Sequence, residues 1–228
     1  MPLYLLHGAL GSASQLEPLA SKFVDARVVE FAGHGNTPLD ARPFALDTFV
    51  AQLDDRLQSD GAKRVDLFGY SMGGYVALAF VLRFPERVKS IFTLGTKFEW
   101  TPDTAAREAS RLDADRIRAK VPQFAEQLER RHAGAGGWQG TLASTAHFLR
   151  ELGDNPALGA AELARIAAPV CIGTGDRDAT VGVEESARVS RQLGNGSLAV
   201  LPKTPHPFEQ VNHSLLADLL KHFVSEHD

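Results

Sequence analysis

A serine with a glycine two residues away on each side is the strongest chemical signal in this sequence: Gly69-Tyr70-Ser71-Met72-Gly73. The run has the form G-x-S-x-G and lies between an apolar segment and a stretch with helical spacing. A serine hydroxyl that attacks a substrate must project from a tight turn between a strand and a helix. Such a turn strains the backbone of the nucleophile, and the two glycines let the neighbouring backbones pass. The motif therefore predicts that Ser71 is a nucleophile.

Short apolar runs alternate with helical patterns along the chain, which is typical of a parallel sheet covered by helices. The expected strands are Leu3–Leu6, Arg27–Phe31, Val65–Phe68, Val88–Leu94, Pro169–Thr174 and Ser197–Leu201. The expected helices include one that begins with a capping box formed by Ser14 and Glu17, and a final one from about Glu209 to Val224. The pattern predicts an α/β fold, a doubly wound parallel sheet in a single domain that spans residues 1–228.

Strand signals are absent from about Thr96 to Ala168, where the pattern is helical. In this stretch Ile117, Val121, Phe124 and Leu128 are expected to share one helix face, and Leu142–Leu152 is expected to form another helix. Residues 96–168 are therefore predicted to be a helical insertion between strands rather than a second domain with its own sheet.

Composition and charge exclude several classes of protein. The formal net charge is -4 and the sequence pI is about 6.1, which argues against the basic surface that nucleic acids need. The single cysteine, Cys171, allows no internal disulfide and lies in an apolar run, which predicts a buried thiol. Neither a signal peptide nor an apolar run of roughly 18 residues is found. We therefore expect a soluble cytoplasmic protein that binds neither nucleic acid nor membrane.

Three motifs together resemble the α/β-hydrolase fold family: Leu6-His7-Gly8-Ala9, Gly33-His34-Gly35-Asn36-Thr37 and Gly69-Tyr70-Ser71-Met72-Gly73-Gly74. Their order and spacing match the family, and the resemblance covers nearly the whole chain outside the middle segment. In that family two backbone N–H groups form an oxyanion hole, and the resemblance assigns them to Met72, after the nucleophile, and to Ala9, after the His-Gly pair. Met72 also begins a helix, so its N–H is free and the helix dipole favours an anion there.

The resemblance also implies a histidine base, because the family's chain order is serine, acid, histidine. His206 follows the last strand, as this order requires, and Pro205 and Pro207 stiffen its loop. Among the other seven histidines, His7 is expected to order the turn after its strand, and His34 lies in a turn flanked by glycines. The remaining five are expected at the surface: His132, His147, His213, His222 and His227.

Two aspartates compete for the role of the acid. The family often shows Gly-x-x-Asp-x-x-Val after this strand, and Gly175, Asp178 and Val181 fit all three positions. Asp176 fits less well, because Ala179 stands where the valine is expected. The resemblance therefore favours Asp178. The alternative is Asp176, which would otherwise be a turn residue that caps the loop and pairs with Arg177.

The chain departs from the family at its start. Members usually carry two further strands before the His-Gly strand, the second of them antiparallel, and this sequence begins almost directly on the His-Gly strand. We therefore expect about six strands, all parallel, with Arg27–Phe31 at an edge of the sheet. The charges of Arg27 and Glu30 favour an edge that stays in water, and so a monomer, over a dimer formed through this strand.

The resemblance implies that residues 96–168 form a lid. Five aromatic residues are candidates to line an acyl pocket, or alternatively pack the lid onto the sheet: Phe98, Trp100, Phe124, Trp138 and Phe148.

Ser71 argues against the branches of the family that have an Asp nucleophile, which are the dehalogenases and epoxide hydrolases. The leading hypothesis is a serine hydrolase that cleaves a small carboxylic ester, thioester or lactone with Ser71, Asp178 and His206, without metal or organic cofactor. The alternatives are a ligand sensor that does not hydrolyse, and a lyase or carbon–carbon hydrolase with the same triad.

Overall fold

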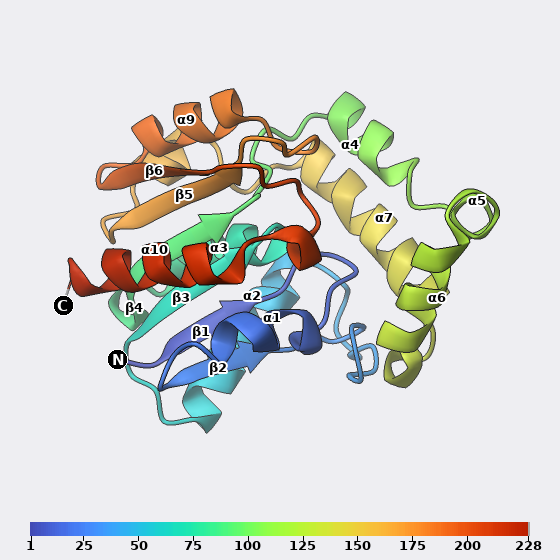
Figure 1. The fold of residues 1–228 in the computed structure, drawn as a ribbon, viewed down its shortest axis with the longest axis horizontal. Helices are drawn as coiled ribbons and strands as arrows, with labels where there is room; N and C mark the ends of the chain where they lie inside the picture. The colour runs from blue at the N-terminus through green and yellow to red at the C-terminus, as the bar shows by residue number, and fades with distance from the viewer. Residues whose placement is uncertain (228) are drawn as a thin grey trace.

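Six parallel strands form a single sheet at the centre of the molecule (Figure 1). The computed structural model describes residues 1–227. In chain order the strands are β1 (Leu3–Leu6), β2 (Ala26–Val29), β3 (Val65–Tyr70), β4 (Val88–Leu94), β5 (Val170–Gly175) and β6 (Gly196–Leu201). Their order across the sheet is β2-β1-β3-β4-β5-β6. The prediction of about six strands, all parallel, is confirmed.

The four inner strands are buried along their whole length, which explains why they are continuous apolar runs in the sequence. The two edge strands are more exposed. The edge position predicted for 27–31 is confirmed, since β2 pairs only with β1. The strand is shorter than predicted and ends at Val29. Glu30 lies beyond it, where its carboxylate accepts hydrogen bonds from the amides of Ala13 and Asn36.

Helices cover both faces of the sheet. On one face lie α1 (Ala13–Ala20) and α10 (His213–Ser225), and on the other lie α2 (Leu46–Ser59), α3 (Met72–Arg83) and α9 (Val183–Gln192) (Figure 1). Helix α1 begins earlier than predicted, because Ser12 is its N-cap and the Ser12 amide donates to Oε1 of Gln15. The final helix begins at His213, after a short 3-10 turn at Phe208–Gln210.

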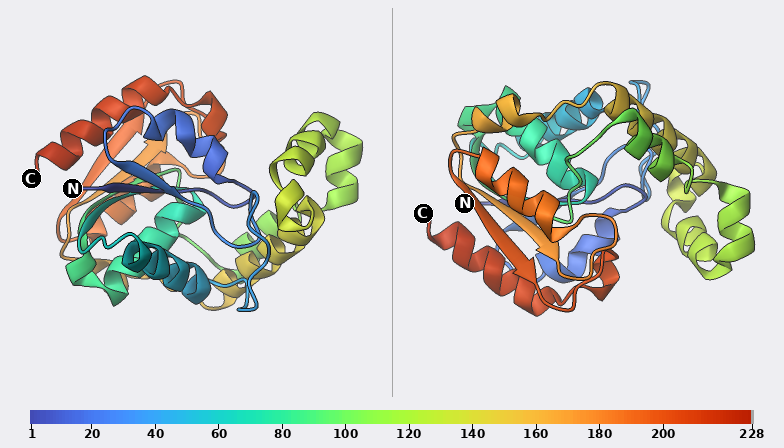
Figure 2. Two further views of the ribbon diagram at one scale, coloured as in Figure 1. Left: turned by 90° about the horizontal axis from the view of Figure 1, so that it is seen from below. Right: turned by 90° about the horizontal axis from the view of Figure 1, so that it is seen from above.

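The stretch between β4 and β5 is helical, as predicted. It consists of α4 (Pro102–Ala109), α5 (Ala114–Lys120), α6 (Pro122–Arg131), α7 (Trp138–Asp154) and α8 (Ala160–Ala164). Helices α5 and α6 stand away from the sheet, and α7 leads back towards it (Figure 2). Within residues 1–227, no helix is long and apolar enough to cross a membrane.

The predicted continuous face at Ile117, Val121, Phe124 and Leu128 is wrong. Pro122 divides the segment into two helices, because a proline disfavours helical backbone in the residue before it. Val121 has φ -140° and ψ 61° and is 50% exposed, whereas Ile117 and Leu128 are buried. The buried residues of this region form their own cluster around Leu10: Ile117, Ala125, Leu128, Trp138 and Leu142. The insertion is therefore packed onto the loop that follows β1.

Candidate active site

Ser71 lies in a tight turn between β3 and α3. Its backbone has φ 52° and ψ -116°, a conformation that a residue with a side chain rarely adopts. A Cβ atom at Gly69 would collide with the backbone of Gly74, and one at Gly73 would collide with the carbonyl group of Leu6. These contacts explain sterically why a glycine is needed two residues away on each side of Ser71, as the G-x-S-x-G spacing predicts.

His206 and Asp178 contact each other at the carboxyl-terminal edge of the sheet. Asp178 lies in the loop after β5 and His206 in the loop after β6. Nδ1 of His206 is 2.7 Å from Oδ2 of Asp178, and this aspartate side chain is only 2% exposed. Oδ1 of Asp178 accepts hydrogen bonds from the amides of Thr180 and Val181, at 2.7 and 2.8 Å. A proton on Nδ1 therefore binds the carboxylate and leaves Nε2 of His206 as an acceptor.

The competing Asp176 is exposed, and among the described residues no hydrogen bond or ion pair joins it to His206. Oδ1 of Asp176 accepts a hydrogen bond from the amide of Thr204 at 3.0 Å. Hydrogen bonds from the backbone of Lys203 and Thr204 lower the pKa of Asp176. It therefore caps the loop that leads to His206, while the expected ion pair with Arg177 is not formed within the described residues. The structure places Asp178, and not Asp176, against His206.

Tyr70, the residue before the serine, holds the histidine loop. Its hydroxyl donates a hydrogen bond to the carbonyl oxygen of His206 at 2.8 Å, and the two rings are 5.5 Å apart. Burial raises the pKa of Tyr70, so the hydroxyl keeps its proton. The sequence gives no signal for this role, because Tyr70 occupies a variable position of the motif.

The end of β4 lies between the Ser71 turn and the loops that carry Asp178 and His206. The amide of Ser71 donates to the carbonyl oxygen of Leu94 at 2.8 Å. A Cβ atom at the next residue, Gly95, would lie 3.1 Å from Oδ2 of Asp178 and 3.3 Å from Nδ1 of His206. Among residues 1–227, no hydrogen bond joins the Ser71 hydroxyl to His206. The Ser71 backbone therefore contacts the end of β4, and the next residue of that segment, Gly95, lies beside the His206–Asp178 pair.

A small cavity of about 50 Å³ lies beside Ser71, and we call it the Ser71 cavity. It is lined by Ala9, Ser71, Met72, Tyr75, Lys97, Trp100, Phe148, Leu149 and Leu152. Ala9 follows β1, and Met72 is the first residue of α3, so the Met72 amide has no partner in the preceding turn. The two residues expected to stabilise an oxyanion thus share one cavity wall with the serine.

The five aromatic candidates separate into two groups. Trp100 and Phe148 line the Ser71 cavity. Phe98 is buried in the core near Tyr75, and Phe124 and Trp138 belong to the cluster around Leu10. Residue type alone does not distinguish an aromatic residue that lines a cavity from one that packs in a core, because both environments are apolar.

The end of α6 binds the loop that carries Ala9. Leu10 has φ 56°, and its carbonyl oxygen accepts hydrogen bonds from Nη1 of Arg131 at 2.9 Å and Nε2 of His132 at 3.0 Å. Nη2 of Arg131 also lies 2.7 Å from Oε1 of Glu209, which follows the histidine loop. Arg131 therefore joins the helical insertion to two loops of the site. No sequence pattern indicates this link, because the segments are far apart in the chain.

Three fully buried histidines lie next to this loop: His7, His34 and His132. His7 orders the turn after β1, as expected, because its ring contacts the Gly8 carbonyl and accepts a hydrogen bond from the amide of Phe31. The surface position predicted for His132 is wrong, since its ring bridges two backbone segments. Burial lowers the pKa of His7 to about 4 and also lowers the pKa of His34 and of His132.

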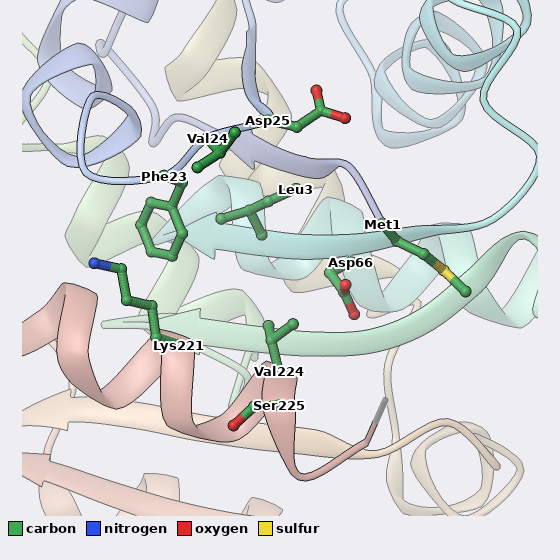
Figure 3. A pocket seen from close by; sticks show the side chains of 9 residues that line it. All are labelled: Met1, Leu3, Phe23, Val24, Asp25, Asp66, Lys221, Val224 and Ser225. Atoms are coloured by element: carbon green, nitrogen blue, oxygen red, sulfur yellow. The ribbon is translucent and has the colours of Figure 1, made fainter.

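A larger hollow of about 400 Å³ lies at the opposite, amino-terminal end of the strands (Figure 3). It is lined by Met1, Leu3, Phe23, Val24, Asp25, Asp66, Lys221, Val224 and Ser225. The buried Asp66 accepts a hydrogen bond from Ser90 at 2.6 Å and so is part of the local packing. Ser71 lies beyond the other end of β3, so this hollow is separate from the candidate active site.

The chain belongs to the alpha/beta hydrolase family, whose model matches residues 3–219. A pimeloyl-[acyl-carrier protein] methyl ester esterase from Chromobacterium violaceum is 28% identical, over 97% of this chain and 91% of that protein. Ethanol acetyltransferase 1 from Cyberlindnera jadinii is 35% identical over 95 residues, and this match spans only 28% of that protein. An esterase from Thermogutta terrifontis has a similar fold, with a TM-score of 0.79 and 19% identity over 100% of this chain and 91% of that one.

Proposed function

We propose that this chain hydrolyses a small carboxylic ester, thioester or lactone through an acyl-enzyme on Ser71. The observation that carries the proposal is the pair formed by His206 and Asp178 at the edge of the sheet where Ser71 projects from its strained turn. The esterase from Chromobacterium violaceum, similar over nearly the whole chain, supports ester hydrolysis as the reaction class.

The proposed reaction has two halves. In the first, Nε2 of His206 takes the hydroxyl proton as Oγ of Ser71 bonds to the acyl carbon, and the alcohol leaves with that proton. In the second, water gives a proton to His206 and attacks the acyl carbon, which releases the acid and restores Ser71. Asp178 fixes the ring orientation and stabilises the imidazolium, and the amides of Ala9 and Met72 stabilise the oxyanion.

Labelling with a fluorophosphonate, together with a panel of p-nitrophenyl esters of increasing chain length, tests this function. We expect the wild-type chain to be labelled and to hydrolyse short esters, and Ser71→Ala to lose the label and at least roughly 10³-fold of the activity. Circular dichroism of the variant controls for the fold. Turnover by Ser71→Ala close to the wild-type rate would refute the mechanism, and a wild-type chain that is neither labelled nor active would favour a ligand sensor.

A further inference from the structure

Lys97 brings a positive charge to the wall of the Ser71 cavity. Most of that wall is apolar, formed by Trp100 and by three residues of α7: Phe148, Leu149 and Leu152. The Lys97 side chain is only 12% exposed. An ammonium group that has lost most of its water needs compensating partners, because the desolvation of a charge is costly.

Glu185 of α9 is the partner of Lys97, but most of its hydrogen bonds go elsewhere. Oε1 of Glu185 accepts from the amides of Phe98 and Glu99, at 2.7 and 2.9 Å. Only Oε2 faces Lys97, and its distance to Nζ is 3.4 Å. This contact is longer than the 2.7–2.9 Å typical of a charge-assisted hydrogen bond. Glu185 thus fixes the segment after β4 through the backbone and holds the lysine only loosely.

The ammonium group of Lys97 keeps donors for a ligand. It has three N–H bonds, and within residues 1–227 Glu185 is the only side chain that accepts a hydrogen bond from it. The ring of Trp100 lies 5.8 Å from Nζ, a cation–π contact that uses none of these donors. Lys97, a residue of the cavity wall, therefore keeps hydrogen-bonding capacity to spare.

We infer that Lys97 binds a carboxylate on the acyl part of the substrate, so that the preferred substrates are monoesters of short dicarboxylic acids. The inference rests on the ester hydrolysis proposed above. The cavity is small, about 50 Å³, and Ser71 and Lys97 both line it, so a substrate bound there lies close to both residues. The largely apolar wall strengthens the attraction between the carboxylate and the ammonium group. A neutral acyl chain of the same length would offer no acceptor to the N–H bonds of Lys97 that Glu185 does not use.

The first test compares mono-p-nitrophenyl succinate with p-nitrophenyl butyrate. We expect Lys97→Met to lower the ratio of the two kcat/KM values, succinate over butyrate, at least about tenfold, mainly through KM. Lys97→Arg keeps the charge and should retain most of the ratio. The matched control is Lys120→Met, an exposed position on α5, which should leave the ratio as in the wild type. A ratio unchanged in a folded Lys97→Met protein would overturn the inference.

The second test does not depend on hydrolysis. Calorimetric titration of the Ser71→Ala protein with methyl hydrogen succinate should detect binding, and adding Lys97→Met should weaken it at least about tenfold. Methyl butyrate should bind equally to both proteins. If the wild type fails to hydrolyse any ester but this binding depends on Lys97, the hydrolase proposal fails and the carboxylate site stands. If methyl hydrogen succinate binds with equal strength with and without Lys97, the carboxylate site is refuted.

Discussion

Nε2 of His132 lies 3.0 Å from the carbonyl oxygen of Leu10, so the end of α6 holds the residue that follows Ala9. Arg131 donates to the same oxygen. A non-glycine residue with φ 56° is strained and persists because its surroundings fix it. The helical insertion thereby controls the backbone of the loop whose amide is proposed to stabilise the oxyanion.

Arg131→Met is expected to lower kcat about tenfold with little change in KM. The reason is that a misplaced oxyanion donor weakens the transition state, and the full loss of one donor costs about 10²- to 10³-fold. Arg131→Lys, which retains one donor, should recover part of kcat. Arg130→Met is the control, because this neighbour is exposed and its only ion pair among the described residues is with Glu126. Equal effects of Arg131→Met and Arg130→Met on kcat would contradict the positioning role.

Asp178→Asn is expected to cost up to about 10⁴-fold in kcat, because an amide at this position favours the wrong tautomer of His206. Asp176→Asn should cost far less, since this side chain caps the loop through the amide of Thr204. Steady-state kinetics of both variants on one ester decide between them. The opposite ranking would transfer the role of the acid to Asp176.

Stability should fall in mild acid. The pKa of His7 is lowered from 6.5 to about 4 by burial, so the unfolded chain takes up a proton in this window while the folded chain does not. Stability is therefore lost as the pH falls from about 6.5 towards 4. For His7 alone the loss at pH 5 is about 2 kcal/mol, and His34 and His132 add to it in the same direction.

Urea denaturation at pH 7.5 and pH 5.0 measures this loss. His7→Gln should reduce the difference between the two pH values, although the variant starts from a lower stability at pH 7.5. His147→Gln, at an exposed position, serves as the control and should retain the full difference. Identical free energies of unfolding of the wild type at the two pH values would show that the buried histidines are not kept neutral by the fold.

The β2 edge is expected to stay unpaired, so that the chain sediments as a monomer at micromolar concentration. Arg27 supports this expectation, because it contacts Asp60 at 3.2 Å and donates to the Tyr4 hydroxyl at 3.0 Å, which keeps a hydrated charge on the edge. Val28→Lys should leave sedimentation unchanged. A dimer that Val28→Lys dissociates would refute the monomeric edge, and one that Val200→Lys dissociates would locate the contact at β6.

The sequence by itself indicated the strands and turns that depend mainly on residues close together in the chain. The buried strands are visible as apolar runs because both faces of an inner parallel strand are covered. The Ser71 turn can be recognised in the sequence because its two glycines are needed for local packing. Gly69 lies against the backbone of Gly74, and Gly73 lies against Leu6 of the adjacent strand. The sequence therefore predicted the sheet and its β2 edge, which the structure confirms, and the nucleophilic role of Ser71 stays a prediction. It failed at Val121, where a proline outweighed the apolar spacing.

Only the tertiary structure decided which distant groups meet. Asp176 and Asp178 are alike as residues, and the choice depends on which carboxylate the folded loop turns towards His206. His132 was expected at the surface because helical spacing does not indicate its contact with the carbonyl group of Leu10, 122 positions earlier in the chain. The role proposed for Lys97 depends on folding, because residues of α7 line the Ser71 cavity with it and Glu185 of α9 pairs with it. These contacts between distant residues depend on loop conformation and on the packing of helices. Neither leaves a periodic pattern of residues in the sequence.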